Sequence, residues 1–180
     1  LMDKYFSGEQ FTMLELIRGI HTGIRDGSIT PVFCGSAANL EGLSLLGGAI
    51  VSMFPSAAEE IPEEGIAGDD VVEIPCKADD PAVAYVFKTI ADPFVGKLSY
   101  VKVAAGTLTP DTELVNMTTG QPEKLGKLLF VRGKKQEEVK SVTAGDICAV
   151  SKLGANTCDT LCSPQRKVTL NKPEFPAPCY

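Results

Sequence analysis

The chain has 180 residues, of which 44% are hydrophobic and 22% charged, a composition typical of a soluble globular protein. It contains no run of 18 apolar residues, so we expect no transmembrane helix and no membrane partner. No secretory signal opens the sequence, and a first residue of leucine suggests a piece of something longer. The six cysteines are scattered, with three inside apolar runs, which favours reduced thiols and a cytoplasmic protein.

The net charge of −6 is unevenly divided along the chain. Residues 1–81 carry 4 Lys and Arg against 14 Asp and Glu, whereas residues 82–170 carry 12 against 8. The second segment therefore has a balance of +4, which suits an anionic partner. The alternative interpretation of this charge distribution is that the surface charge is simply uneven and has no function.

Residues 12–25 are predicted to form an amphipathic helix, because Thr12 and Glu15 have the spacing of a capping box. Residues 29–34 are an apolar run that predicts a strand covered on both faces. Asn39 is expected to cap a second helix. The side chains expected to pack that helix on a sheet are Leu43, Leu46, Ile50 and Val51. This order of elements predicts the incomplete end of an α/β unit.

The pattern changes after residues 55–81, where prolines and acidic residues show no regular periodicity and predict a connector. From residue 82 onward, short runs rich in β-branched and aromatic residues alternate with Gly, Pro and Asp turns. The runs are 82–90, 97–105, 112–116, 124–131 and 147–153. They predict a mainly β fold, a small antiparallel β-barrel of Greek-key type, with a sandwich as the alternative.

Motifs for catalysis are missing from the sequence. The single histidine, His21, lies in the first predicted helix, and no Cys-x-x-Cys is present, so we expect no metal site. Ser36 lacks the flanking glycines of a nucleophile elbow. No Gly-Lys pair is part of a G-x-x-x-x-G-K-[ST] phosphate loop. The chain alone is therefore expected to have no catalytic residue, to need no cofactor and to be inactive as an enzyme.

Several motifs together resemble one family, bacterial elongation factor G, a translational GTPase. They are PVFCGSA (31–37), FKTIADPFVGKLSYVKVAAGTL (87–108), AGDI (144–147), DTLC (159–162) and EFPAP (174–178). The resemblance implies that residues 1–54 end the GTPase domain, that 55–81 form a linker, that 82–170 form the β-barrel domain II, and that 171–180 begin domain III. It implies GTP and Mg²⁺ as cofactors of the parent protein only.

The resemblance also implies two sets of site residues. Gly35, Ser36 and Ala37 correspond to the last guanine-nucleotide loop of the family, which works only with the preceding parts of the GTPase domain. The barrel is expected to dock on the small ribosomal subunit through rRNA phosphates, with no role for DNA. The candidates for these contacts are Lys124, Lys127, Arg132, Lys134 and Lys135. A hairpin that is merely solvated is the alternative for this basic cluster.

One position departs from the family pattern, since Cys158 precedes Asp159 where the family usually has glycine. If the backbone there needs a positive φ, the cysteine is strained by about 1 kcal/mol or more. This departure leaves a ribosomal-protection relative or a divergent paralogue as alternative functions, beside a β-barrel interaction domain of an unrelated enzyme. Self-association is also expected, because the α/β tail would expose an apolar helix face.

Overall fold

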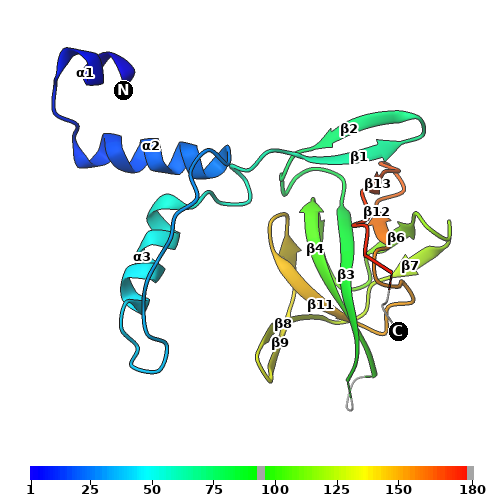
Figure 1. The fold of residues 1–180 in the computed structure, drawn as a ribbon. Helices are drawn as coiled ribbons and strands as arrows, with labels where there is room; N and C mark the ends of the chain where they lie inside the picture. The colour runs from blue at the N-terminus through cyan, green and yellow to red at the C-terminus, as the bar shows by residue number, and fades with distance from the viewer. Residues whose placement is uncertain (93–95, 178–180) are drawn as a thin grey trace. The chain divides into compact units, whose positions relative to one another are not determined.

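The computed structural model describes residues 1–92 and 96–177 (Figure 1). Leu1–Glu60 form one compact unit and Ile61–Tyr180 a second. The helices, all in the first unit, are α1 (Met2–Ser7), α2 (Met13–Arg25) and α3 (Leu43–Met53). Within the described residues, no helix is long and apolar enough to cross a membrane.

The second unit consists of short antiparallel strands. They are β1 (Glu63–Ala67), β2 (Asp70–Ile74), β3 (Val83–Asp92), β4 (Gly96–Ala105), β5 (Thr107–Leu108), β6 (Glu113–Asn116), β7 (Pro122–Lys124), β8 (Leu128–Arg132), β9 (Lys135–Val139), β10 (Val142–Thr143), β11 (Ile147–Ser151), β12 (Thr160–Cys162) and β13 (Thr169–Leu170). The main sheet has the order β7-β6-β12-β3-β4-β11-β8-β9, and smaller sheets have the orders β13-β1-β2 and β10-β5. The predicted mainly β, antiparallel fold is confirmed.

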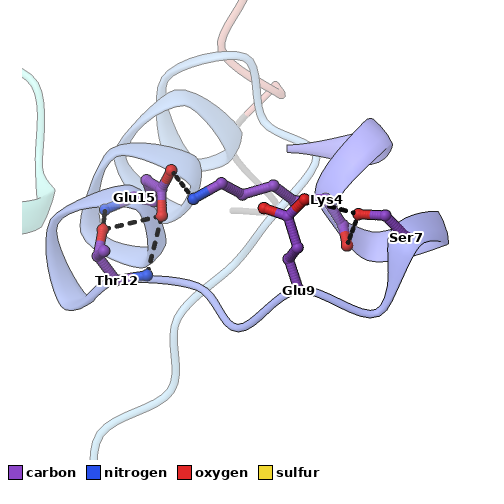
Figure 2. Close-up of polar contacts among 5 residues, drawn as sticks. All are labelled: Lys4, Ser7, Glu9, Thr12 and Glu15. Atoms are coloured by element: carbon purple, nitrogen blue, oxygen red, sulfur yellow. Dashed lines mark hydrogen bonds and ion pairs between the residues drawn. The ribbon is translucent and has the colours of Figure 1, made fainter.

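The start of α2 has the predicted capping box (Figure 2). The Thr12 amide donates to the Glu15 carboxylate over 2.9 Å, and the Glu15 amide donates to the Thr12 hydroxyl over 3.3 Å. Lys4 of α1 lies 2.7 Å from the same carboxylate. Its hydrogen bond, followed by those from Thr12, lowers the pKa of Glu15 to about 2. The helix predicted over residues 12–25 is thus confirmed, with α1 tied to its first turn.

The strand predicted over residues 29–34 does not form, and Asn39 does not cap the next helix. A strand needs a neighbour to pair with, and no described residue pairs with this segment. Ser36 and Glu41 instead close a turn through two backbone hydrogen bonds, of 3.1 and 3.0 Å. Asn39 lies inside that turn, so α3 begins after Gly42, whose φ is +79°. Both sequence predictions were therefore wrong.

The barrel has one main hydrophobic core, formed by inward-facing residues of most of its strands. The alternation along the long strands β3 and β4 brings Val86 and Val101 into this core, where they face each other across the pair. Leu108, which follows the turn at Gly106, is fully buried in the same core. Burial of these side chains supplies the main stabilising term for the unit.

The run predicted as one strand over residues 124–131 is split into β7 and β8, a correction with a clear cause. The Leu125 amide donates to the Thr112 carbonyl, next to β6, over 3.0 Å. Two residues later, the Lys127 carbonyl accepts from the amide of Ser151, at the end of β11, over 3.2 Å. The chain therefore crosses here from one side of the main sheet to the other. Gly126 permits the crossing, because a Cβ there would lie 2.4 Å from the Ser151 carbonyl oxygen.

The interval 55–81, predicted to lack regular structure, contains the hairpin of β1 and β2. Strand β1 also pairs with β13, from Gly65 opposite Leu170 to Ile66 opposite Thr169. A second core lies under this small sheet and includes Ile74 and Val168. The sequence of β1 is rich in Gly and acidic residues, which do not favour a strand, so β1 forms because it pairs with the distant strand β13.

Candidate functional site

The loop Gly35-Ser36-Ala37 is held by the turn that precedes α3. The Ser36 amide is already bonded to the Glu41 carbonyl, and the Ser36 hydroxyl accepts from the Asn39 amide over 3.3 Å. A Cβ at position 35 would lie 2.7 Å from the Glu41 carbonyl oxygen, so only glycine fits there. The Ala37 amide has no hydrogen-bond partner among the described residues. The Gly35 amide likewise has no partner there, so these two amides are the donors in this loop that a ligand carbonyl could use.

A cavity of about 370 Å³ opens beside this loop. Its walls include Phe33, Gly35, Ala37 and the side chain of Leu43. The absence of a side chain at Gly35 and the Ala37 amide, unpaired in the part of the chain that the structure describes, would allow a planar heterocycle with a carbonyl group to contact the backbone here. No group of three or more His, Cys, Asp or Glu in residues 1–92 and 96–177 is placed to hold a metal ion.

The five predicted basic residues do not form one cluster. Arg132, Lys134 and Lys135 lie together at the turn of the β8–β9 hairpin, where Arg132 and Lys135 are opposite each other. Lys124 belongs to β7, at the other end of the strand order. Lys127 precedes β8, at the far end of the hairpin from the turn.

Ion pairs within the barrel occupy three of these five side chains. The nitrogen–oxygen distances are 3.0 Å for Lys124–Asp111, 2.7 Å for Lys127–Glu138 and 2.8 Å for Arg132–Glu137. The hydrogen bond to Asp111 raises the pKa of Lys124. Lys134 and Lys135 are exposed and have no ion pair among the described residues. Of these five residues, the two without an ion pair in the described part of the chain therefore lie at the hairpin turn.

A feature that the sequence analysis missed lies next to this turn. A cavity of about 300 Å³ is lined by Tyr100 of β4, Ile90 of β3, Val131 of β8 and Lys134. Its described residues come from two pairs of neighbouring strands, β3–β4 and β8–β9, that are far apart in the sequence. The only sequence feature that could have pointed to this surface is Lys88, a charged residue next to Phe87 that interrupts the apolar run 82–90.

The predicted departure at Cys158 has a structural consequence. Its φ is +70°, in the left-handed region, so the cysteine occupies a conformation that favours glycine. The next residue, Asp159, is only 4% exposed and accepts hydrogen bonds from the Asn156 amide and the Asn116 side chain, over 2.8 and 2.9 Å. This buried carboxylate fixes the turn before β12, and it lies in the barrel rather than at either candidate site.

Comparison with known proteins finds similarity to elongation factor G. Residues 81–164 match the family model for elongation factor G domain 2. The chain is 35% identical to elongation factor G of Aquifex pyrophilus over 181 aligned positions, which cover 99% of this chain and 26% of that protein. A crystal structure of a protein from Thermus thermophilus matches with a TM-score of 0.70 and 28% identity. That match covers 96% of this chain and 23% of the other.

The chain therefore spans about a quarter of the length of these relatives. The family match covers β3 to β12, the strands that enclose the main core, and the relatives extend the similarity across the helical unit. Residues 81–164 match the elongation factor G domain 2 family, and the chain as a whole is similar to a segment of elongation factor G.

Proposed function

We propose that this chain is part of a ribosomal translocation factor, in which residues 82–170 dock on the small ribosomal subunit. The observation that carries the proposal is the exposed pair Lys134 and Lys135 at the β8–β9 turn, in a barrel whose family is that of elongation factor G. Phosphate oxygens of rRNA are the anions that such lysines would contact. Lys124, Lys127 and Arg132 support docking less directly, because each is already paired with a carboxylate.

The test is to replace Arg132, Lys134 and Lys135 together by Glu in the whole protein and to measure its affinity for ribosomes at several salt concentrations. We expect weaker binding and a smaller dependence of log affinity on log salt. The matched control changes Lys140, Lys152 and Lys167 to Glu, three exposed lysines outside the turn. Equal effects of the two triple variants would show a general charge effect and would remove the hairpin from the docking surface.

We also propose that Gly35, Ser36 and Ala37 contribute one wall of a guanine-nucleotide site in the whole protein. Its support is the Ala37 amide, which has no partner among the described residues, beside the close approach at Gly35. GTP with Mg²⁺ would supply the hydrolysable phosphate, bound by parts of the protein other than this loop. The barrel would then transmit the nucleotide state to later domains, and the chain alone would be inactive.

This second proposal predicts that Ala37→Pro, which removes the amide hydrogen, weakens guanine-nucleotide binding by the whole protein. Ala37→Ser, which keeps the amide, is the matched control. Affinity for a fluorescent GDP analogue measures both. Equal affinities of the Pro and Ser variants would exclude the Ala37 amide as a guanine contact.

The domain limits follow from these assignments as proposals: 1–54 as the end of a GTPase domain, 55–81 as the linker, 82–170 as domain II and 171–180 as the entry to domain III. A cytoplasmic location fits a ribosome-bound factor. In the first unit Val32, Leu45 and Val51 are 86%, 79% and 88% exposed. We therefore expect the isolated chain to self-associate through these apolar side chains. Light scattering after size-exclusion chromatography would contradict this if it gave a monomer at high concentration.

A divergent paralogue or a ribosomal-protection factor is the second candidate, favoured by Cys158 at a φ of +70°. A translocation assay with the whole protein separates the two functions. Movement of tRNA and mRNA with GTP supports the translocation factor. Release of a bound inhibitor without translocation supports the protection factor.

A further inference from the structure

An aromatic pair stands on the outside of the barrel where β3 is irregular. Val86 pairs with Val101 and Lys88 with Tyr100, so Phe87 is the extra residue of a β-bulge. Bulges re-aim side chains and are common beside functional sites. Phe87 is 40% exposed, and its ring centroid lies 6.2 Å from that of Tyr100 with an angle of 54° between the rings. The bulge therefore leaves two aromatic rings together at the surface.

Tyr100 also forms a wall of the cavity of about 300 Å³ beside the β8–β9 turn. Ile90 and Val131 supply apolar walls, and both pack on a small cluster that is separate from the main barrel core. Strands β3, β4 and β8 hold these three side chains, so the cavity has a regular framework. A flat apolar group would gain contact with the Tyr100 ring there.

Two exposed lysines, one in the lining of this cavity and one beside it, lie close to its aromatic wall. Lys134 lines it, and Lys88, paired in register with Tyr100, is exposed. The one carboxylate among its described lining residues, Asp92, accepts a hydrogen bond from Gln136 over 3.1 Å. The two other nearby acids, Glu137 and Glu138, are in ion pairs on the hairpin. A partner that fits this surface combines a planar apolar group with negative charge.

We propose that this aromatic–lysine pocket, formed by Ile90, Tyr100, Val131 and Lys134 with Phe87 beside it, binds an unpaired base of single-stranded RNA. The base stacks on the Tyr100 ring, and the phosphates on either side of it lie near Lys134 and Lys88. Stacking on aromatic side chains combined with basic groups along the backbone is the general way in which proteins hold single strands. The inference rests on the proposed function, because it assigns RNA to the same end of the barrel.

The test uses the 180-residue chain and a short fluorescein-labelled oligoadenylate, with binding followed by fluorescence anisotropy. We expect the single strand to bind more tightly than the same oligonucleotide annealed to its complement. Tyr100→Ala should weaken single-strand binding by about tenfold, whereas Tyr100→Phe, which keeps the ring, should bind as the wild type does. Lys134→Gln should reduce the salt dependence of binding.

Circular dichroism melting shows whether each variant is folded, and the exposed Phe87→Ala provides a second variant in case Tyr100→Ala unfolds. Equal affinities of wild type, Tyr100→Ala and Phe87→Ala would overturn the proposal, as would tighter binding of the duplex. If the oligonucleotide test fails while the Arg132, Lys134 and Lys135 triple variant still weakens ribosome binding, the pocket is excluded and docking stands. A pocket that binds a protein side chain instead would give that same pattern.

Discussion

The side-chain amide of Asn116 donates a hydrogen bond to the carboxylate of Asp159 over 2.9 Å, and both residues are buried. The side-chain carbonyl oxygen of Asn116, Oδ1, in turn accepts a hydrogen bond from the backbone amide of Thr118 over 2.9 Å. The pair joins β6 to the turn before β12, two segments that are 43 residues apart in the chain. The Asn116 side chain thus stabilises both the buried Asp159 carboxylate and the turn that contains Thr118.

Replacing Asn116 by Ala should lower the free energy of unfolding of the barrel by about 2–3 kcal/mol, because it removes a bond to a buried carboxylate and leaves the Thr118 amide unpaired. Urea unfolding followed by circular dichroism measures the change. Asn171→Ala, at an exposed position, serves as the control and should change the stability little. A loss of less than about 0.5 kcal/mol at position 116 would contradict this account.

Asp159 should make the stability depend on pH. Burial alone would raise its pKa, but hydrogen bonds from the Asn156 amide and from Asn116 and Thr118 outweigh burial and hold the pKa below its ordinary value. The stabilisation is therefore complete above the unfolded-state pKa of about 3.9 and is lost as the pH falls through the lower folded-state pKa. The stability gap between wild type and Asp159→Asn should narrow below about pH 4. A gap that is constant between neutral and acid pH would contradict this.

Cys158→Gly should raise the free energy of unfolding by about 1 kcal/mol, because glycine adopts a φ of +70° without the strain imposed by a Cβ. The thiol of Cys158 also lies beside the Tyr85 phenol, whose pKa burial raises to about 12 with a further contribution from this thiol. Cys158→Ala removes the thiol but keeps the strain, so it is the matched control. If Ala stabilises as much as Gly, the thiol rather than the backbone explains the effect.

Gly106→Ala should destabilise the barrel by about 2 kcal/mol more than Gly120→Ala. Both glycines have a positive φ, of +78° and +72°, so both substitutions introduce similar backbone strain. At Gly106, however, the new Cβ would lie 2.5 Å from the Ala82 Cα, whereas nothing lies within 4 Å of it at Gly120. Chemical unfolding of both variants measures the difference. Equal losses would show that backbone strain alone matters at position 106.

The sequence by itself determined the features that depend on neighbouring residues. The Thr12–Glu15 capping box, the long runs that become β3 and β4, and the positive φ of Gly106 all follow from short-range hydrogen bonding, alternation and turn chemistry. The left-handed conformation of Cys158 was predictable only from its resemblance to a glycine position of a known family.

Only the tertiary structure decided the features that need a distant partner. Residues 29–34 form no strand, because nothing described pairs with them, whereas β1 forms because β13 does. The run 124–131 breaks because its backbone must bond to both the β6 and β11 sides of the barrel. The pocket beside Tyr100 exists because the β3–β4 pair and the β8–β9 hairpin meet in space. Strand pairing is non-local, so its free energy is not contained in any short stretch of sequence.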